Sequence, residues 1–189
     1  MALERGFKAW SERVAQAMRS ELELSAEMPL PVQLLAEHLE IKLITPTQID
    51  GLPADVLHQL TVVDPSGWSA ASFEKDGSPV IIFNDKNSQG RQSSDIAHEL
   101  AHVIRAHDPS QLILAPDGSF AMRSYDPKQE DEANWLGWTV LLPRAALLRC
   151  ADLKMSTEQI ALEYQVSAQL VEYRTRMTGI AKQTRWRRR

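Results

Sequence analysis

The chain has 189 residues, of which 43% are hydrophobic and 24% charged, a balance that is typical of a folded globular protein and excludes wholesale disorder. No apolar run approaches the roughly 18 residues of a membrane-spanning helix, and the first residues lack the apolar stretch of a signal peptide, so no membrane partner is expected. A single cysteine, Cys150, excludes an intrachain disulfide and favours a reducing, cytoplasmic setting.

The formal net charge of −4 is unevenly distributed along the chain. Residues 182–189 carry five positive charges and no acid, whereas residues 1–181 hold 16 basic and 25 acidic side chains. An acidic body repels phosphate groups, so the composition does not favour direct nucleic-acid binding. We interpret the basic tail as a solvated chain end with the chemistry to contact an anionic partner.

The N-terminal part of the chain, residues 1–60, is predicted to be mainly helical. Apolar residues recur at helical spacing, Pro31 suits a first helical turn, and a β-type run ends at Pro46. These patterns predict, in chain order, a helix over about 6–24, a helix over 32–39, a strand over 41–45 and a helix over 54–60.

The middle part, residues 61–145, alternates strand and helix patterns. Strands over 68–73 and 80–83 flank a turn that contains Gly77, which predicts a hairpin. The remaining patterns predict a helix that Ser93 or Ser94 caps and that reaches Ile104, an irregular loop over 108–126, and a helix that begins after Asp126 and ends before Pro143.

The C-terminal part, residues 146–181, predicts two further helices, one from Ser156 or Thr157 and one from Ser167 to Gly179. Neither a repeat nor a linker divides the chain, so we expect a single α+β domain over 1–181, followed by the basic tail. In this domain a small antiparallel or mixed sheet packs with helices, and additional helices lie at both termini.

The strongest functional signal is the run His98-Glu99-Leu100-Ala101-His102 on the helix predicted after the hairpin. Helical positions four apart lie on one face, so both imidazoles can bind one ion, and zinc accepts two nitrogens at this geometry. Glu99 would lie beside the open metal position, where it can act as general base toward a water. The motif therefore predicts a hydrolytic site with one Zn²⁺ per chain.

A hydrolytic zinc site needs a third protein ligand that leaves the fourth position to water. Asp108 lies six residues after His102, a spacing that one class of zinc peptidases uses, but that class needs a glycine where this chain has Arg105. His107 faces away from the ligand stripe and suits a helix end, where it favours the helix dipole. Neither residue is the preferred candidate.

Glu130 and Glu132 are better candidates for the third ligand because they lie on a separate helix that can pack against the first. Glu132 borders the apolar face that Trp135 and Leu136 form, and a carboxylate at such a border can point inward to a cation. We therefore favour Glu132, with Glu130 as the alternative.

One further residue and two further segments have two interpretations each. Tyr125 is a candidate oxyanion donor, although a packed or surface tyrosine is the simpler interpretation. The strand at 80–83 is either a sheet edge that adds a substrate strand or a core strand with a covered edge. The segment 157–177 has a helix–turn–helix outline, but its glutamates disfavour phosphate binding and indicate a structural or substrate-docking role.

The chain resembles the ImmA/IrrE family of metallopeptidases in two motifs, HELAH at 98–102 and EDEANW with a later LLP at 130–143. The likeness covers about residues 66–145 and extends to 160–176. It implies a zincin-like fold of the gluzincin type, with the two histidines as zinc ligands and Glu99 as general base. The family pattern places the third ligand directly before Ala133, at Glu132. Gly137 stands where the family usually has alanine, which we expect to change little.

The resemblance implies a zinc endopeptidase that cleaves a specific cytoplasmic protein, of the helix-turn-helix repressor type. One alternative is a non-catalytic regulator, in which a structural metal stabilises a domain that binds a repressor without cleaving it. Another is a DNA-binding regulator that uses residues 182–189 and the last two helices. Glu99→Gln separates the first two hypotheses, because an enzyme would keep its metal and lose cleavage, whereas a binding protein would keep its activity.

Overall fold

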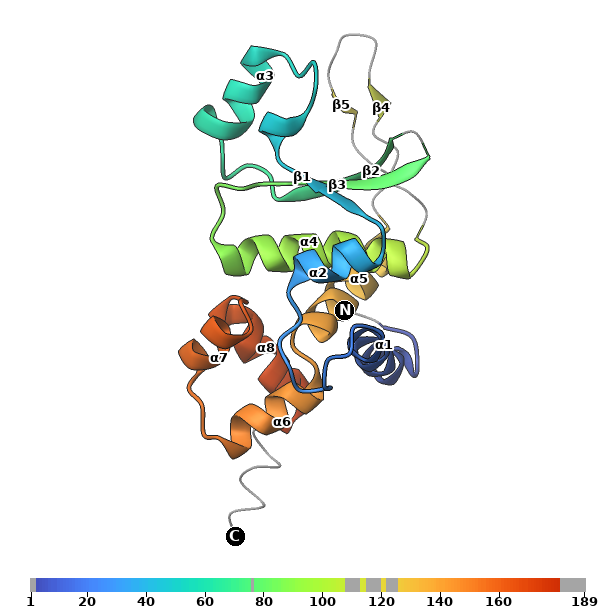
Figure 1. The fold of residues 1–189 in the computed structure, drawn as a ribbon, viewed down its shortest axis with the longest axis vertical. Helices are drawn as coiled ribbons and strands as arrows, with labels where there is room; N and C mark the ends of the chain where they lie inside the picture. The colour runs from blue at the N-terminus through green and yellow to red at the C-terminus, as the bar shows by residue number, and fades with distance from the viewer. Residues whose placement is uncertain (1–2, 76, 108–112, 115–119, 122–125, 181–189) are drawn as a thin grey trace.

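The computed structural model describes residues 3–75, 77–107, 113–114, 120–121 and 126–180, and its elements follow the order helices, sheet, helices (Figure 1). The predicted α+β fold is confirmed. The elements are α1 (Phe7–Glu21), α2 (Val32–His38), β1 (Lys42–Ile44), η1 (Pro46–Gln48), α3 (Ala54–His58), η2 (Gln59–Val63), β2 (Ala70–Lys75), β3 (Ser78–Phe83), α4 (Gln89–Ile104), β4 (Ile113–Leu114), β5 (Phe120–Ala121), α5 (Pro127–Leu141), α6 (Arg144–Asp152), α7 (Thr157–Glu163) and α8 (Ala168–Thr178).

The three-stranded sheet is mixed, with the strand order β1-β3-β2. β1 pairs with β3 in parallel and β2 pairs with it antiparallel, so that Leu43 and Ser72 both lie opposite Ile81. The predicted hairpin is confirmed. The interpretation of residues 80–83 as a sheet edge is wrong, because β3 is the middle strand and β2 is an outer strand of this sheet.

Helix α4 lies between the sheet and the helical half of the molecule (Figure 1). Its apolar side packs against the sheet and α5, and Ile96 and Leu100 are completely buried there. Apolar side chains at i and i+4 therefore fix how α4 is rotated, and this rotation directs His98 and His102 toward α5. The sheet and α5 together position the motif at residues 98–102.

Helices α4 and α5 approach each other closely at Gly137. A Cβ atom at this position would lie 2.7 Å from the carbonyl oxygen of Ala97 and 3.1 Å from the backbone nitrogen of His98. The expectation that a glycine here changes little is wrong, because both of these neighbours are backbone atoms that cannot turn aside. Because Gly137 has no side chain, α5 can approach α4, the helix that carries His98 and His102.

The helical half is held together by two buried arginines in addition to its apolar core. Arg19 of α1 donates to the carbonyl oxygens of Met28 and Ala15, and burial lowers its pKa to about 10. Arg174 of α8 donates to the carbonyl oxygen of Leu142 and pairs with Glu12 at 2.7 Å. The bonds of Arg174 connect α8 to α1 and to Leu142 at the end of α5.

Most helix ends follow the predicted caps. Asp126 accepts a bond from the backbone nitrogen of Lys128 at 2.8 Å, Ser167 caps α8, and Gly179 ends it in the left-handed region. The predicted start of α4 is wrong: the residue before the helix is Ser88, five residues before Ser93, and Ser94 bonds to the carbonyl oxygen of Gly90 instead of capping. The first turn of α4 contains no apolar side chain, so periodicity could not reveal it.

Two segments contain regular structure that was not expected. α6 follows Pro143 directly and buries Ala146, Leu147 and Cys150. The segment predicted as an irregular loop contains an antiparallel pair, β4 and β5. Within the described part of the chain, no helix combines the length and the hydrophobicity that a membrane span needs.

Candidate metal site

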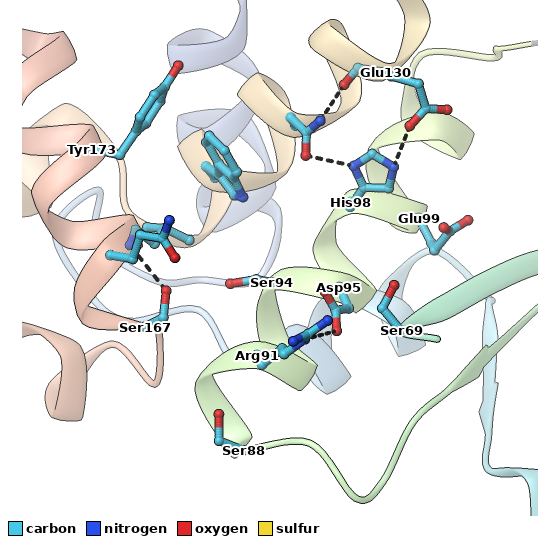
Figure 2. A pocket seen from close by; sticks show the side chains of 14 residues that line it. Ser69, Ser88, Arg91, Ser94, Asp95, His98, Glu99, Glu130, Ser167 and Tyr173 are labelled. Atoms are coloured by element: carbon cyan, nitrogen blue, oxygen red, sulfur yellow. Dashed lines mark hydrogen bonds and ion pairs between the residues drawn. The ribbon is translucent and has the colours of Figure 1, made fainter. Parts of the chain in front are cut away.

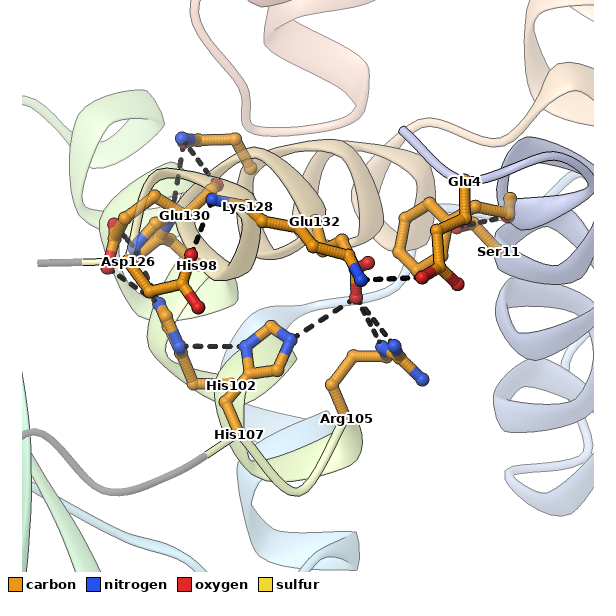
Figure 3. A network of polar contacts seen from close by, with 12 residues as sticks. Glu4, Ser11, His98, His102, Arg105, His107, Asp126, Lys128, Glu130 and Glu132 are labelled. Atoms are coloured by element: carbon orange, nitrogen blue, oxygen red, sulfur yellow. Dashed lines mark hydrogen bonds and ion pairs between the residues drawn. The ribbon is translucent and has the colours of Figure 1, made fainter. Parts of the chain in front are cut away.

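Two helices bring three potential metal ligands together. On α4, the Nε2 atoms of His98 and His102 lie 3.1 Å apart. From α5, the carboxylate of Glu130 approaches both rings, with one oxygen 3.2 Å from Nε2 of His98 and the other 3.6 Å from Nε2 of His102 (Figure 3). Among the described residues, these three form the group with the spacing of a metal site.

The distances within this group fit a tetrahedral metal ion. Zinc bonds of about 2.0–2.2 Å place the ligand atoms of a tetrahedron about 3.3–3.6 Å apart. The two Nε2 atoms lie 3.1 Å apart, each has a different oxygen of Glu130 at 3.2 or 3.6 Å, and one ligand atom from each residue lies within 4.8 Å of the others. Two imidazole nitrogens and one carboxylate oxygen are also a common donor set of catalytic zinc sites. The group can therefore hold a metal ion and leave one position open.

The orientation of His98 is fixed by Asn134. The Nδ1 atom of His98 lies 3.1 Å from Oδ1 of Asn134, whose own amide nitrogen donates to the carbonyl oxygen of Glu130 at 2.9 Å. If Nδ1 carries the proton and donates to Asn134, Nε2 keeps its lone pair for a metal. Sequence reasoning missed this role, although Asn134 lies four residues after Glu130 and hence on the same side of α5.

Glu132 lies apart from the metal group that it was expected to join. Its side chain is 2% exposed, and one carboxylate oxygen accepts from two nitrogens of Arg105, at 2.8 and 2.6 Å. The same oxygen lies 3.4 Å from Nε2 of His107. Residues two apart on a helix differ by about 200° around its axis, so Glu130 and Glu132 face different neighbours.

Glu99 lies next to the metal group and is nearly buried. Its side chain is held by Ser72 of the outer strand β2, whose hydroxyl donates to Oε2 at 2.7 Å. Glu99 also lines the same cavity as His98 and Glu130. A carboxylate in this position is placed to exchange a proton with a molecule bound at the open side of the group.

A cavity of about 640 Å³ opens beside the group. Figure 2 shows His98, Glu99 and Glu130 on one side of this cavity and Tyr173 and Ser167 of the α8 region on the other. Tyr173 packs against Trp138 with ring centroids 4.7 Å apart. Burial raises the pKa of Asp95 in the cavity wall, and Arg91, 3.6 Å away, partly opposes this shift. The cavity thus combines polar and aromatic walls.

Several residues considered from the sequence lie outside the described part of the chain. These are Asp108, the disfavoured third ligand, Tyr125, the candidate oxyanion donor, and the basic tail 182–189. The helix–turn–helix outline at 157–177 does form two helices, α7 and α8, and α8 contributes Leu170 and Tyr173 to the cavity.

Comparison with known proteins supports a particular family. The sequence profile of a family described as IrrE N-terminal-like domain matches residues 58–176. No curated protein sequence matches the chain. Among solved structures, the chain is similar to a Mycobacterium tuberculosis transcriptional regulator, with a TM-score of 0.51 and 16% sequence identity. The similarity covers 91% of this chain and 47% of the regulator, so this chain spans about half the regulator's length and shares its fold.

Proposed function

The chain belongs to the IrrE N-terminal-like domain family, and from this premise we propose that it is a zinc-dependent endopeptidase. The observation that carries the proposal is the convergence of His98, His102 and Glu130, with Glu99 beside them. This is the arrangement that a hydrolytic zinc site requires: three ligands, one open position and a nearby base.

We assign the third ligand to Glu130 rather than Glu132. Among the described residues, Glu130 has no arginine or lysine partner, and its ion-pair contacts are with His98 and His102. Its negative charge is therefore available to a cation, whereas that of Glu132 is already balanced by Arg105.

Different residues of the chain then have different roles in peptide hydrolysis. A bound zinc ion would polarise the scissile carbonyl and make water a better nucleophile at neutral pH. Glu99 takes the proton from the attacking water and passes it to the leaving amine. Ser72 keeps the Glu99 carboxylate in place, and Asn134 orients His98.

The substrate is proposed to be a protein segment in extended conformation. β2 is an outer strand, Ser69 just before it lines the cavity, and Ser72 within it contacts Glu99. A peptide that pairs with β2 would therefore pass the metal group with its backbone held by hydrogen bonds. From the family resemblance we propose a helix-turn-helix repressor as the protein cleaved.

Glu99→Gln tests the proposal. The variant should retain one zinc per chain, because Glu99 is not a ligand, and should lose at least about a thousandfold in cleavage rate, because the base is gone. Cleavage would be followed by mass spectrometry on helix-turn-helix regulators of the same organism, starting with products of adjacent genes.

His58→Gln on α3 is the matched control, since His58 is an exposed histidine of another helix, and it should cleave at the wild-type rate. Cleavage by Glu99→Gln at the wild-type rate would contradict the mechanism. Full biological activity of this variant, with a stable and uncut complex, would instead establish the non-catalytic regulator.

A further inference from the structure

His102 has a second contact, on the side of its ring that faces away from the metal group. Its Nδ1 atom lies 3.0 Å from Nδ1 of His107, and Nε2 of His107 lies 3.4 Å from Oε2 of Glu132. The same oxygen of Glu132 is bonded by Arg105. Figure 3 shows these four side chains as one continuous series, which we call the His107 relay.

The backbone brings His107 back to His102 although it lies five residues further along the chain. After α4, Ala106 adopts a left-handed conformation with φ of 50°, and the backbone nitrogen of His107 donates to the carbonyl oxygen of His102 at 3.0 Å. This is a typical helix ending, and it turns the His107 side chain toward α5. The contact is therefore part of how α4 terminates.

The His107 relay is largely protected from water. The side chains of His102, His107 and Glu132 are 9%, 6% and 2% exposed, and Arg105 is 31% exposed at the outer end. Buried polar groups must satisfy one another, because solvent cannot replace a missing partner. The direction of each hydrogen bond within the relay is consequently determined by its two ends.

When each of the two rings carries one proton, the two ends allow one arrangement of those protons. Glu132 and its Arg105 partner fix an acceptor at one end, so His107 directs its Nε2–H toward Glu132 and presents an unprotonated Nδ1 to His102. His102 must then donate from Nδ1, which leaves Nε2 unprotonated toward His98 and Glu130. A metal-binding imidazole needs this tautomer.

We propose that His107 and Glu132 are positioning residues that orient His102 and keep its Nε2 available to zinc. This inference rests on the proposed zinc site, and it gives Glu132 a role in that site without direct ligation. Outer partners of metal-binding histidines typically change metal affinity by about 10–100-fold, so loss of the relay should have an effect of this size.

The outer end of the relay also contacts the N-terminal helix. The guanidinium of Arg105 lies 5.1 Å from the ring centroid of Trp10 and 5.4 Å from that of Phe7, both in α1. These cation–π contacts hold Arg105 where it can bond Glu132. α1 thereby supports the site without lining its cavity.

The test is the zinc affinity of the full chain, measured by competition with a chelator, together with the visible absorption of the Co²⁺-substituted protein. His107→Phe removes both ring nitrogens, and we expect it to weaken zinc binding about 10–100-fold and to alter the Co²⁺ bands. His107→Gln should recover part of the affinity, because an amide oxygen can accept from Nδ1 of His102. His58→Gln is the exposed-histidine control.

Wild-type affinity and an unchanged Co²⁺ spectrum in His107→Phe would overturn the inference, even if the variant were less stable. Absence of zinc binding by the wild-type chain would refute the proposed function instead, which separates the two failures. If His107→Phe does not fold, Glu132→Gln replaces it: we expect at least about threefold weaker zinc binding, and unchanged affinity would overturn the relay.

Discussion

Glu130 and Glu132 lie two residues apart on α5, yet they are found in different surroundings. Glu130 is 17% exposed, borders the cavity and contacts two imidazole nitrogens. Glu132 is 2% exposed and is bonded by the guanidinium of Arg105. A carboxylate whose charge is already balanced within the protein has little to offer a cation, whereas one that faces two imidazole nitrogens can complete a metal site. Burial alone therefore does not identify a ligand.

The comparison also separates two functions of the same helix. The Glu130 side of α5 supplies chemistry to an open cavity, and the Glu132 side holds α4 and α1 in place through Arg105. If this division is correct, substitutions on the two sides should affect metal binding and folding stability in different proportions.

Glu132→Ala should lower the free energy of unfolding of the metal-free protein by about 1–3 kcal/mol, because it leaves Arg105 and His107 without their buried acceptor. The matched substitution Glu130→Ala should change it by less than about 0.5 kcal/mol, since Glu130 makes no bond to an arginine or lysine of the described residues. Urea unfolding of both variants without metal provides the comparison. Equal losses would show that the two sides are not specialised.

Gly137→Ala should destabilise the protein by about 1 kcal/mol. The added methyl group would press on the backbone of Ala97 and His98, a cost of about 1–3 kcal/mol, which the better helix propensity of alanine offsets by up to about 1 kcal/mol. Thermal unfolding would measure the change, and zinc affinity should fall as well because α5 carries Glu130. A more stable variant with unchanged affinity would show that α4 and α5 tolerate a wider spacing.

Arg105→Lys should have a small effect on stability, a loss of about 0.5 kcal/mol. Lysine keeps the positive charge near Glu132 but cannot supply two nitrogens to one oxygen or stack equally well on Phe7 and Trp10. Zinc should still bind at one ion per chain, as metal analysis would show. Loss of zinc from this variant would contradict the prediction and would show that Arg105 contributes to metal binding.

The fold could be predicted from the sequence wherever local signals act alone. Caps at Asp126 and Ser167 and the left-handed Gly179 depend on neighbouring residues, and the structure has them as expected. The first turn of α4 could not be predicted, because its residues are polar and its position depends on tertiary packing: Gly90 passes so close to the backbone of Val166 that a Cβ would lie 2.7 Å away. Such a contact is invisible in a sequence.

In the candidate site, too, local features could be predicted from the sequence and tertiary contacts could not. The spacing of His98 and His102 on one helix is a local property, and the structure brings their rings together. The partner carboxylate depends on how α5 is rotated against α4, which the apolar pattern alone does not determine. That pattern correctly predicted that Glu132 points inward, but the inward space holds Arg105 and His107, and neither neighbour could be placed without the tertiary structure.

The most direct test of Glu130 as the third ligand is the zinc content and zinc affinity of Glu130→Gln and Glu132→Gln, measured side by side with the wild-type chain. We predict that Glu130→Gln binds zinc at least about a hundredfold more weakly, since loss of a ligand should exceed the 10–100-fold effect of an outer partner, and that Glu132→Gln still binds one zinc per chain. The opposite result, zinc retained by Glu130→Gln and lost by Glu132→Gln, would contradict the assignment of Glu130 as the third ligand.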